Sequence, residues 1–543
     1  MAKSSNKTKK PKAPSPARNW MALWPYLGIT AFFAIIYWLI FNEAIDLNGD
    51  NASYYILGKS LNSGNGYTLL SDIKQSPHGH FPPGYPFLIS VFMVISKEVV
   101  FIKAVNGLFL LGAFLVFFRL CRIYKVPDLL ALVTTFFLMF NYPLLKSSTV
   151  MMSEIPFLFF SLLTLFLFLK SDEKKGWDYF VAAIISLSLA YHIRTQGIAL
   201  LGGIIVFYIL KKKYQKAGLT FFGFFLLALP WTIRGKLAGI SSGYVNQLLM
   251  KNPYQAHLGQ AGIGDFLARI GDNAGRYLCK EIPQTLLPFL EVNYKEPSPV
   301  SYWIFGVAIV LLFLTGMGYA FQHKQKLLLA SYFLFSGIIF LLWPAEWVGT
   351  RFITPVIPFI MLFTVAGLYF LTELVIEKAG SGNNKYLRFA FTGLLITSVL
   401  TVYLQPFVYE DKSDADKRPF RRLLVEKQGI YPPGYANYFE MAEFVKANLP
   451  EDAVVACRKP LLFHLYSEGY TTLYPFEKDQ DKLLKGLKDK QVDYVVLEQI
   501  GYSSTSLYLL PVFENNRSLW RDVHFLDDPK TYLIQLVPEA FPE

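Results

Sequence analysis

Long apolar runs alternate with short polar connections along most of the chain. The first run, Leu23–Phe41, carries no charged residue and is long enough to cross the roughly 30 Å hydrocarbon core of a bilayer. No small-residue cleavage site follows it, so a signal peptide is a poorer interpretation. Ten further runs follow, several of them short for a full crossing: Val99–Leu120, Leu129–Phe140, Ile155–Leu169, Trp177–Ile193, Gly197–Leu210, Leu219–Trp231, Ser301–Phe321, Leu327–Trp343, Ile353–Ile376 and Phe389–Phe407.

One shorter apolar segment, Pro86–Ser96, interrupts this alternation. Its length of about eleven residues fits an interfacial or re-entrant helix better than a span, and a crossing here would turn every later loop to the opposite side. We therefore expect it on the outer surface. The whole pattern predicts an α-helical polytopic membrane protein, with about eleven transmembrane helices and one outer interfacial helix, joined to a small α/β soluble domain.

Positive charge follows this topology. The chain is 53% hydrophobic and only 17% charged, with a net charge of +12, whereas soluble domains carry about 25% charged residues. By the positive-inside rule the N-terminus lies in the cytoplasm and the C-terminus outside, and the net charge indicates topology rather than a nucleic-acid partner. The basic residues concentrate in alternate connections, at Arg119, Arg122 and Lys125; Lys170, Lys174 and Lys175; Lys211, Lys212, Lys213 and Lys216; Lys324 and Lys326; and Lys378, Lys385 and Arg388.

Composition divides the chain into four segments. Residues 1–22 form a basic, disordered cytoplasmic tail, and residues 23–408 form the membrane domain, with long outer loops at 42–98 and 235–300. A charged linker at 409–433 leads to an exocytoplasmic α/β domain at 434–543. Three cysteines show neither metal spacing nor a disulfide framework. The α/β domain at 434–543 is expected to contain strands at Ala453–Cys457, Val492–Glu498 and Thr531–Val537, and a helix at Asp479–Lys490.

The outer loops carry the candidate chemistry, because ionisable residues at the edge of a membrane bundle are functional candidates by default. In the first loop, Asp50 opens a helix-like stretch that includes Tyr54, and His80 precedes a proline turn that ends with Tyr85. Asp50 fits a plain helix N-cap equally well. The proline cluster fits a simple re-entry turn as well as a substrate-shaping element.

Four more ionisable residues fall at outer ends of predicted spans. Glu154 starts one span and Arg194 ends another. Arg234 and Arg351 occupy similar positions further along the chain. Purely structural roles also stay open. Glu154 fits a helix cap or an ion-pair partner of Lys146, and the outer arginines fit side chains that reach toward lipid headgroups.

The order of several segments resembles the C-type glycosyltransferase superfamily. These polytopic enzymes use polyprenyl-phosphate sugars and include protein O-mannosyltransferases and the aminoarabinose transferases that modify lipid A. The bacterial group with a periplasmic C-terminal domain is the nearest variant. The segments are GDNASYYILGKSLNSGNGY, FPPGYPFLISVF, SEIPFLFFSLL, YHIRTQGIALL, LPWTIRGK, WVGTRFITPVIPF and, near the C-terminus, NLPEDAVVACRKPLLFHLYSEGYTTLYPF followed by VDYVVLE.

The resemblance implies roles for these residues. Asp50 matches the first-loop acid that acts as base or orienter at the acceptor, and Glu154 matches the second, supporting acid. A phosphate leaving group needs no general acid, only cations, while a positioned base contributes roughly 10²–10⁴-fold. Direct displacement then inverts the anomeric centre. The expected substrate-binding residues are Tyr54, His80, Tyr85, Arg194, Arg234 and Arg351, although Phe81 replaces the residue that some relatives keep basic before the prolines.

The resemblance also sets the expected partners: a polyprenyl-phosphate sugar donor, a lipid, glycan or protein acceptor, the bilayer, and no nucleic acid. The expected location is a bacterial inner membrane with a periplasmic active face. No cofactor follows from the sequence; the pair His78 and His80 leaves a divalent metal open. The competing interpretations are a polytopic transporter or flippase, an oligosaccharide polymerase or ligase, and a structural or sensory membrane protein.

Overall fold

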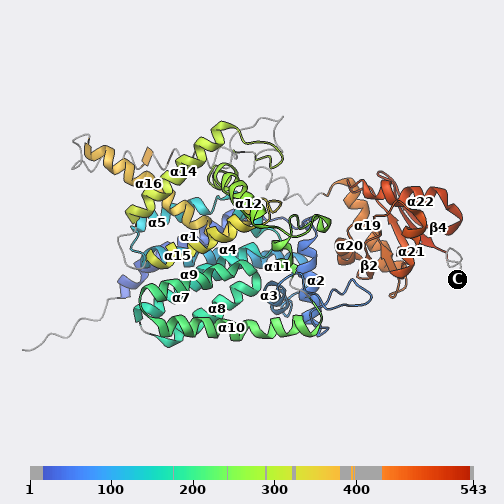
Figure 1. Ribbon diagram of the computed structural model, residues 1–543, viewed down its shortest axis with the longest axis horizontal. Coiled ribbons are helices and arrows are strands. Elements are labelled where there is room, and N and C mark those ends of the chain that lie inside the picture. The colour runs from blue at the N-terminus through green and yellow to red at the C-terminus, as the bar shows by residue number, and fades with distance from the viewer. Residues whose placement is uncertain are drawn as a thin grey trace, which may run out of the picture.

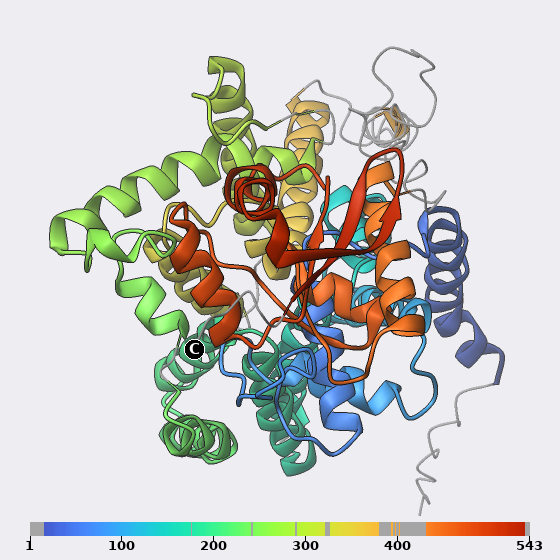
Figure 2. The same ribbon diagram turned by 90° about the vertical axis from the view of Figure 1, so that its right-hand side faces the viewer.

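The protein folds into a helical bundle and a smaller part built on a β-sheet. The structure, a computed structural model, describes residues 16–174, 176–240, 243–287, 290, 292–320, 326–378 and 431–537, with a few positions between 393 and 401. The bundle comprises the described residues up to 378, and the sheet lies beside one end of it (Figure 1). A view from that end shows the sheet and its helices lying over the bundle (Figure 2).

Helices occupy the first ten of the eleven predicted spans. The eleventh, Phe389–Phe407, lies outside the described residues apart from a few scattered positions. The helices are α1 (Pro16–Ile40), α4 (Val99–Ile123), α5 (Asp128–Leu138), α7 (Glu154–Lys174), α8 (Trp177–Ile193), α9 (Ile198–Leu210), α10 (Tyr214–Leu237), α14 (Val300–Ala320), α15 (Lys326–Leu342) and α16 (Ile357–Lys378).

Six of these helices are long and apolar enough to cross a membrane. A seventh crossing results if α5 and α6 (Tyr142–Ser148), which meet at an angle of 59°, form one span. The break between them has a local cause, because Asn141 caps α6 by accepting from the Leu144 N–H and Pro143 suits only a helix start. The chain is therefore an integral, mostly helical membrane protein, and eleven crossings stay a prediction.

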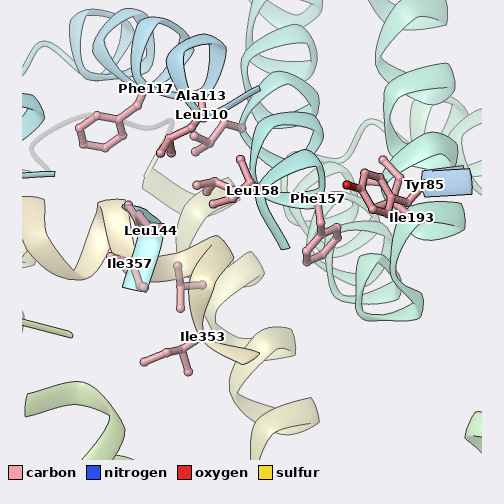
Figure 3. Packing of buried hydrophobic residues seen from close by; sticks show 14 of the residues in the cluster. Tyr85, Leu110, Ala113, Phe117, Leu144, Phe157, Leu158, Ile193, Ile353 and Ile357 are labelled. Atoms are coloured by element: carbon pink, nitrogen blue, oxygen red, sulfur yellow. The ribbon is translucent and has the colours of Figure 1, made fainter. Parts of the chain in front are cut away.

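The bundle packs an apolar interior and also presents an apolar exterior. Large side chains such as Trp24, Phe222 and Ile304 are exposed on the outer surfaces of α1, α10 and α14. Exposed apolar surface of this extent suits contact with lipid tails rather than water. Figure 3 shows part of the interior, where α4, α6, α7 and the start of α16 meet through Leu110, Ala113, Phe117, Leu144, Phe157, Leu158, Ile353 and Ile357.

The first outer loop is pinned to the bundle by a buried lysine. Lys103 of α4 is 1% exposed and donates to the Asn42 carbonyl and side-chain oxygens at 2.8 and 2.9 Å, and also to the Ala44 carbonyl. The loop then forms α2 (Asp50–Asn62) and α3 (Gly84–Phe92). With nine residues, α3 spans only about 14 Å and cannot cross a bilayer. A short helix that does not span the membrane is what Pro86–Ser96 predicted, and its position on the outer side stays a prediction.

Short helices fill the second outer segment and the turns between spans. These are α11 (Gly243–Leu249), η2 (Ala256–Leu258), α12 (Ile263–Arg276), the π-helical turn η3 (Tyr277–Glu281) and α13 (Ile282–Leu286), with single 3₁₀ turns η1 (Thr195–Gly197), η4 (Thr350–Phe352) and η5 (Thr354–Val356).

The smaller part is a five-stranded sheet in the order β2-β1-β3-β5-β4. Strand β1 pairs in parallel with β2 and β3, whereas β5 runs antiparallel to β3 and β4. The predicted segments appear as β1, β3, β5 and α21. The elements are α19 (Pro433–Asn448), β1 (Val454–Ala456), α20 (Pro460–Ser467), β2 (Tyr470–Thr472), α21 (Gln480–Asp489), β3 (Tyr494–Leu497), η7 (Thr505–Leu509), α22 (Leu510–Asn515), η8 (Arg517–Leu519), β4 (Trp520–Leu526) and β5 (Thr531–Leu536).

The sheet part contacts the first outer loop directly. The Thr471 N–H donates to the Ser71 carbonyl at 2.8 Å, and the Ile45 N–H donates to the Tyr431 hydroxyl at 2.9 Å. An ion pair of 3.3 Å joins Lys59 of α2 to Glu468. The loop that carries Asp50 is therefore held between the bundle and the C-terminal part.

Candidate active site

Two acids and two arginines from four distant segments meet at the outer-loop end of the bundle. Glu154 Oε1 lies 2.7 Å from Arg194 Nη1 and 3.5 Å from Arg351 Nε. Arg351 Nη1 also lies 3.9 Å from Asp50 Oδ2. We call Asp50, Glu154, Arg194 and Arg351 the carboxylate–arginine cluster. The sequence singled out all four, but it could not show that they are neighbours.

Glu154 is the buried centre of this cluster. It is the first residue of α7 and only 2% of its side chain is exposed, while Arg194 follows the last residue of α8 and is 13% exposed. Arg194 also donates to the Ser153 hydroxyl at 3.1 Å. The second carboxylate oxygen, Glu154 Oε2, has no hydrogen-bond partner among the described residues. A buried carboxylate held by two arginines stays ionised and fixes where the guanidinium groups lie.

Asp50 occupies the exposed side of the cluster. Gly49, with φ of 94°, is the N-cap of α2, and Asp50 is the first helical residue. A left-handed turn of this kind suits glycine. No hydrogen bond from a first-turn N–H of α2 to the Asp50 carboxylate occurs in the described residues, and 40% of the side chain is exposed. Its carboxylate is thus open to a ligand and faces Arg351.

Arg351 is held more loosely than Arg194. Its side chain is 45% exposed, and both of its ion pairs are longer than the 2.7 Å pair of Arg194. The left-handed Gly349, with φ of 113°, turns the chain into the short helix η4 that carries Arg351. An exposed cation with long contacts can turn toward an added anion without first breaking a tight ion pair.

Aromatic residues of the first loop form the wall beside the cluster. The Tyr54 hydroxyl lies 3.2 Å from the Ser153 hydroxyl, next to Glu154. The Tyr54 ring packs against Phe81 and Tyr85, with centroid distances of 4.7 and 5.0 Å. Tyr85 itself is buried and its hydroxyl donates to Asn106 Oδ1 at 3.1 Å. Tyr54 therefore borders the cluster. Tyr85 lies behind Tyr54, where its buried ring has a packing role.

The turn that carries Arg351 is braced by residues that the sequence did not single out. Arg276 and Glu281 form a buried 2.9 Å ion pair, and Arg276 donates to the Ala345 carbonyl at 2.6 Å. The Gly349 N–H donates to Glu281 at 3.4 Å, and Gln196 donates to the Phe352 carbonyl at 3.0 Å. These contacts join the second outer segment and the turn after Arg194 to the Arg351 turn. Apart from the Arg276–Glu281 ion pair, these contacts end on backbone carbonyl or amide groups, which no residue pattern reveals.

Arg234, His78 and His80 lie in the same loop region but outside the cluster's ion pairs. Arg234 donates to the His78 and Tyr67 carbonyls, each at 2.9 Å, and its guanidinium lies 4.8 Å from the Trp231 ring centroid. His78 Nε2 accepts from the Phe81 N–H at 3.1 Å, and burial, then His80 and Arg234, lower the pKa of His78 to about 4. Arg234 therefore shapes the loop. His80 is exposed and packs edge-on against Phe81.

No metal centre accompanies the cluster in the described part of the chain. There, no group of three or more His, Cys, Asp or Glu side chains lies close enough to hold an ion. Of the two ring nitrogens of His78, Nε2 already accepts from the Phe81 N–H.

A groove of about 790 Å³ lies elsewhere, between α1 and α4, and shares no residue with the cluster. Its walls are mostly apolar, with Glu43 as the one charged residue among the described residues of the lining, and exposed Trp38 and Leu108 place it on the outer surface of the bundle. The candidate site is therefore the carboxylate–arginine cluster, which brings two acids and two arginines together.

Comparison with known proteins identifies the fold. The family model of the dolichyl-phosphate-mannose-protein mannosyltransferases matches residues 56–241, a range that includes Glu154 and Arg194. No curated protein matches in sequence. The structure is similar to ArnT from Cupriavidus metallidurans bound to undecaprenyl phosphate, with a TM-score of 0.57 and 13% identity over 97% of this chain and 100% of that one. The chain has the C-type glycosyltransferase fold.

A second solved structure has this fold too. The apo oligosaccharyltransferase from Archaeoglobus fulgidus matches with a TM-score of 0.57 and 13% identity, over 95% of this chain and 75% of that one. The resemblance to the C-type glycosyltransferase superfamily, expected from the order of sequence segments, is thus confirmed, as is the predicted mixture of a membrane bundle and a small C-terminal sheet.

Proposed function

We propose that this C-type glycosyltransferase moves one sugar from a polyprenyl-phosphate donor to an acceptor hydroxyl on the outer, periplasmic face of a bacterial inner membrane. The observation that carries the proposal is the exposed Asp50 carboxylate, 3.9 Å from Arg351 and next to the buried Glu154–Arg194 pair. Displacement of a lipid phosphate requires an accessible base to take the acceptor's proton and an accessible cation to stabilise the leaving phosphate. The fold and the family match support this proposal.

In this reaction Asp50 is the base. The acceptor oxygen forms a bond to the anomeric carbon as its proton passes to Asp50, and the bond from that carbon to the phosphate oxygen breaks. The electron pair leaves with polyprenyl phosphate, so a single displacement inverts the anomeric configuration. Asp50 suits this role because its side chain is 40% exposed and because Gly49, not Asp50, is the N-cap of α2.

Arg351 stabilises the leaving phosphate, and Glu154 positions Arg351. The two carboxylates and two arginines of the carboxylate–arginine cluster have a net charge of zero. A phosphate that enters the site is therefore stabilised only if one arginine turns away from its carboxylate and toward the phosphate. Arg351 is the cation that can be released, because its contacts to Asp50 and Glu154 are the long ones. Glu154 and Arg194, at 2.7 Å and largely buried, keep their pairing throughout. Glu154 Oε2, which has no hydrogen-bond partner among the described residues, can then accept a hydrogen bond from a hydroxyl of the donor sugar.

The donor is tested by reconstituting the protein with a panel of labelled polyprenyl-phosphate monosaccharides and lipid-linked oligosaccharides. We expect release of polyprenyl phosphate from a monosaccharide donor and the opposite anomeric configuration in the product. Arg351→Ala should slow transfer by about 10²–10³-fold, the usual effect of removing one charge-stabilising donor. Retained configuration, or transfer from oligosaccharide donors alone, would contradict the proposal.

A further inference from the structure

The parallel half of the C-terminal sheet contains a topological switch point. Its strands lie in the order β2-β1-β3, so the chain leaves β1 toward one side of the sheet and reaches β3 on the other. Parallel pairing of Ala456 with Val495 brings the carboxyl ends of β1 and β3 to the same edge. In open parallel sheets with this order, ligands bind outside the strand ends at the switch point.

Charged residues follow both strands at this edge. Arg458 and Lys459 come shortly after β1, which ends at Ala456. Glu498 comes directly after β3, which ends at Leu497. None of these residues belongs to the carboxylate–arginine cluster. We call the region of Arg458, Lys459, Glu498, Phe476 and Tyr502 the switch-point edge.

Exposed aromatic rings flank the cations. The Arg458 guanidinium lies 4.3 Å from the Tyr502 ring centroid and 5.1 Å from that of Phe476, and the Lys459 amine lies 5.0 Å from Tyr502. Tyr502 and Phe476 are 40% and 48% exposed, which is costly for large rings in a water-facing domain. Aromatic faces beside fixed cations offer a surface for a ring that also carries negative charge.

Buried polar atoms at this edge lack partners. Glu498 is 4% exposed; the Thr505 hydroxyl donates to its Oε1, whereas Oε2 has no hydrogen-bond partner among the described residues. Arg458 Nε is likewise buried and unpartnered there. Burial raises the pKa of Glu498 to about 7, so near neutral pH this group can accept or donate a hydrogen bond. A polar ligand could form hydrogen bonds with both Glu498 Oε2 and Arg458 Nε, which indicates that the switch-point edge is a binding site.

We infer that the switch-point edge binds an anionic saccharide, with the sugar ring on Tyr502 and Phe476 and its phosphate or carboxylate on Arg458 and Lys459. Glu498 Oε2 then faces a sugar hydroxyl. The identification of this saccharide as part of the acceptor rests on the proposed function; the binding itself does not. The acceptor would accordingly be a charged glycan or glycolipid rather than an unmodified protein.

Binding is tested calorimetrically on the full-length protein in phosphatidylcholine nanodiscs, with glucose 6-phosphate, glucuronic acid and glucose as probes and no lipid donor present. We expect saturable binding of at least one charged sugar, more weakly or not at all of glucose. The charged probe that binds identifies the anion as phosphate or carboxylate. Arg458→Ala should lower the affinity about tenfold or more. Lys459→Gln provides the same test if Arg458→Ala fails to fold.

Arg521→Ala is the matched control, because Arg521 is an exposed arginine on β4 at the far edge of the same sheet. Absence of saturable binding by both charged sugars would overturn the inference. So would equal affinity for glucose, or equal affinities of the Arg458→Ala and Arg521→Ala proteins. Since no sugar transfer is measured, failure of the proposed reaction would leave these outcomes unchanged.

Discussion

At the scale of single residues, burial separates the two acids that the sequence treats alike. Asp50 and Glu154 both start helices, and the pattern alone leaves each as a cap or a catalytic group. The structure places Glu154 inside a double ion pair and leaves Asp50 on the exposed side. Accessibility depends on which loops fold over a helix end, and that information is not in the local sequence.

Glu154→Gln should destabilise the protein strongly. The substitution leaves Arg194 and Arg351 without their buried counter-charge, and breaking a buried pair typically costs about 3–5 kcal/mol. A lower thermal unfolding midpoint in detergent would show this. Glu173→Gln at the other end of α7 is the control, since its 2.8 Å pair with Lys170 is more exposed and contributes at most about 1 kcal/mol. Equal thermal unfolding midpoints for Glu154→Gln and Glu173→Gln would refute the role of Glu154 as the buried counter-charge of the two arginines.

Glu498 should make the C-terminal part less stable as the pH rises. Its folded pKa, raised to about 7 by burial, exceeds the value of about 4.3 in an unfolded chain. Between these values the folded form keeps a proton that the unfolded form has lost. The free energy of unfolding therefore falls across this window, by up to about 4 kcal/mol, and levels off above it. Hydrogen exchange of β1 and β3 at pH 5 and pH 8 measures this difference.

The control for this pH effect is Glu498→Gln. Its amide oxygen can still accept from Thr505, but the side chain cannot titrate. Exchange in β1 and β3 should then be equally protected at both pH values, after correction for the intrinsic rate. A wild-type protein without any pH-dependent difference would show that Glu498 titrates normally.

At the scale of elements, apolar length predicts helices well and short or polar strands poorly. Ten predicted spans and the outer helix α3 correspond to helices, because each depends on a run of apolar residues. Strand β2 was missed because its three residues include Thr471 and Thr472, whereas the equally short β1 is entirely apolar. Strand β4 was missed because Arg521, Asp522 and His524 make it polar at the sheet edge. These strands form by pairing with neighbours, which a local pattern does not contain.

Contact between α3 and α8 is an element-scale feature that one methyl group should disturb. A Cβ at Gly84 would lie 2.5 Å from the His192 carbonyl carbon and 2.6 Å from the Ile193 nitrogen, just before Arg194. We expect Gly84→Ala to destabilise the protein by about 1–3 kcal/mol and to reduce sugar transfer. Gly218→Ala in α10 is the control, since nothing lies within 4 Å of its Cβ. Equal unfolding midpoints for both variants would disprove tight packing there.

At the scale of the whole molecule, charge distribution predicts orientation. Helices α2 and α3 of the first outer loop and the C-terminal sheet lie at one end of the bundle (Figure 1). Asp50 of the cluster is the first residue of α2, whereas the basic connections come after the last residues of α4, α7 and α9. Interior packing, by contrast, could not be predicted, because contacts such as Asn141 with Thr285 join residues that are far apart in sequence.

This orientation is testable by labelling with a membrane-impermeant maleimide in intact cells. Lys74→Cys in the first outer loop should be labelled, whereas Lys212→Cys, between α9 and α10, should react only after permeabilisation. Both positions are exposed, and the native cysteines Cys121, Cys279 and Cys457 are buried, so background labelling should be low. The reverse pattern would invert the topology and place the cluster in the cytoplasm.

The most direct test of the central claim is sugar transfer from polyprenyl-phosphate donors by the wild-type protein, Asp50→Asn and Asp72→Asn. Asp72 lies in the same outer loop, where its carboxylate accepts from the Lys74 N–H, and it takes no part in the cluster. Loss of the base should slow transfer by about 10²–10⁴-fold in a folded Asp50→Asn protein, while Asp72→Asn stays close to wild type. Equal transfer by all three proteins would contradict Asp50 as the base.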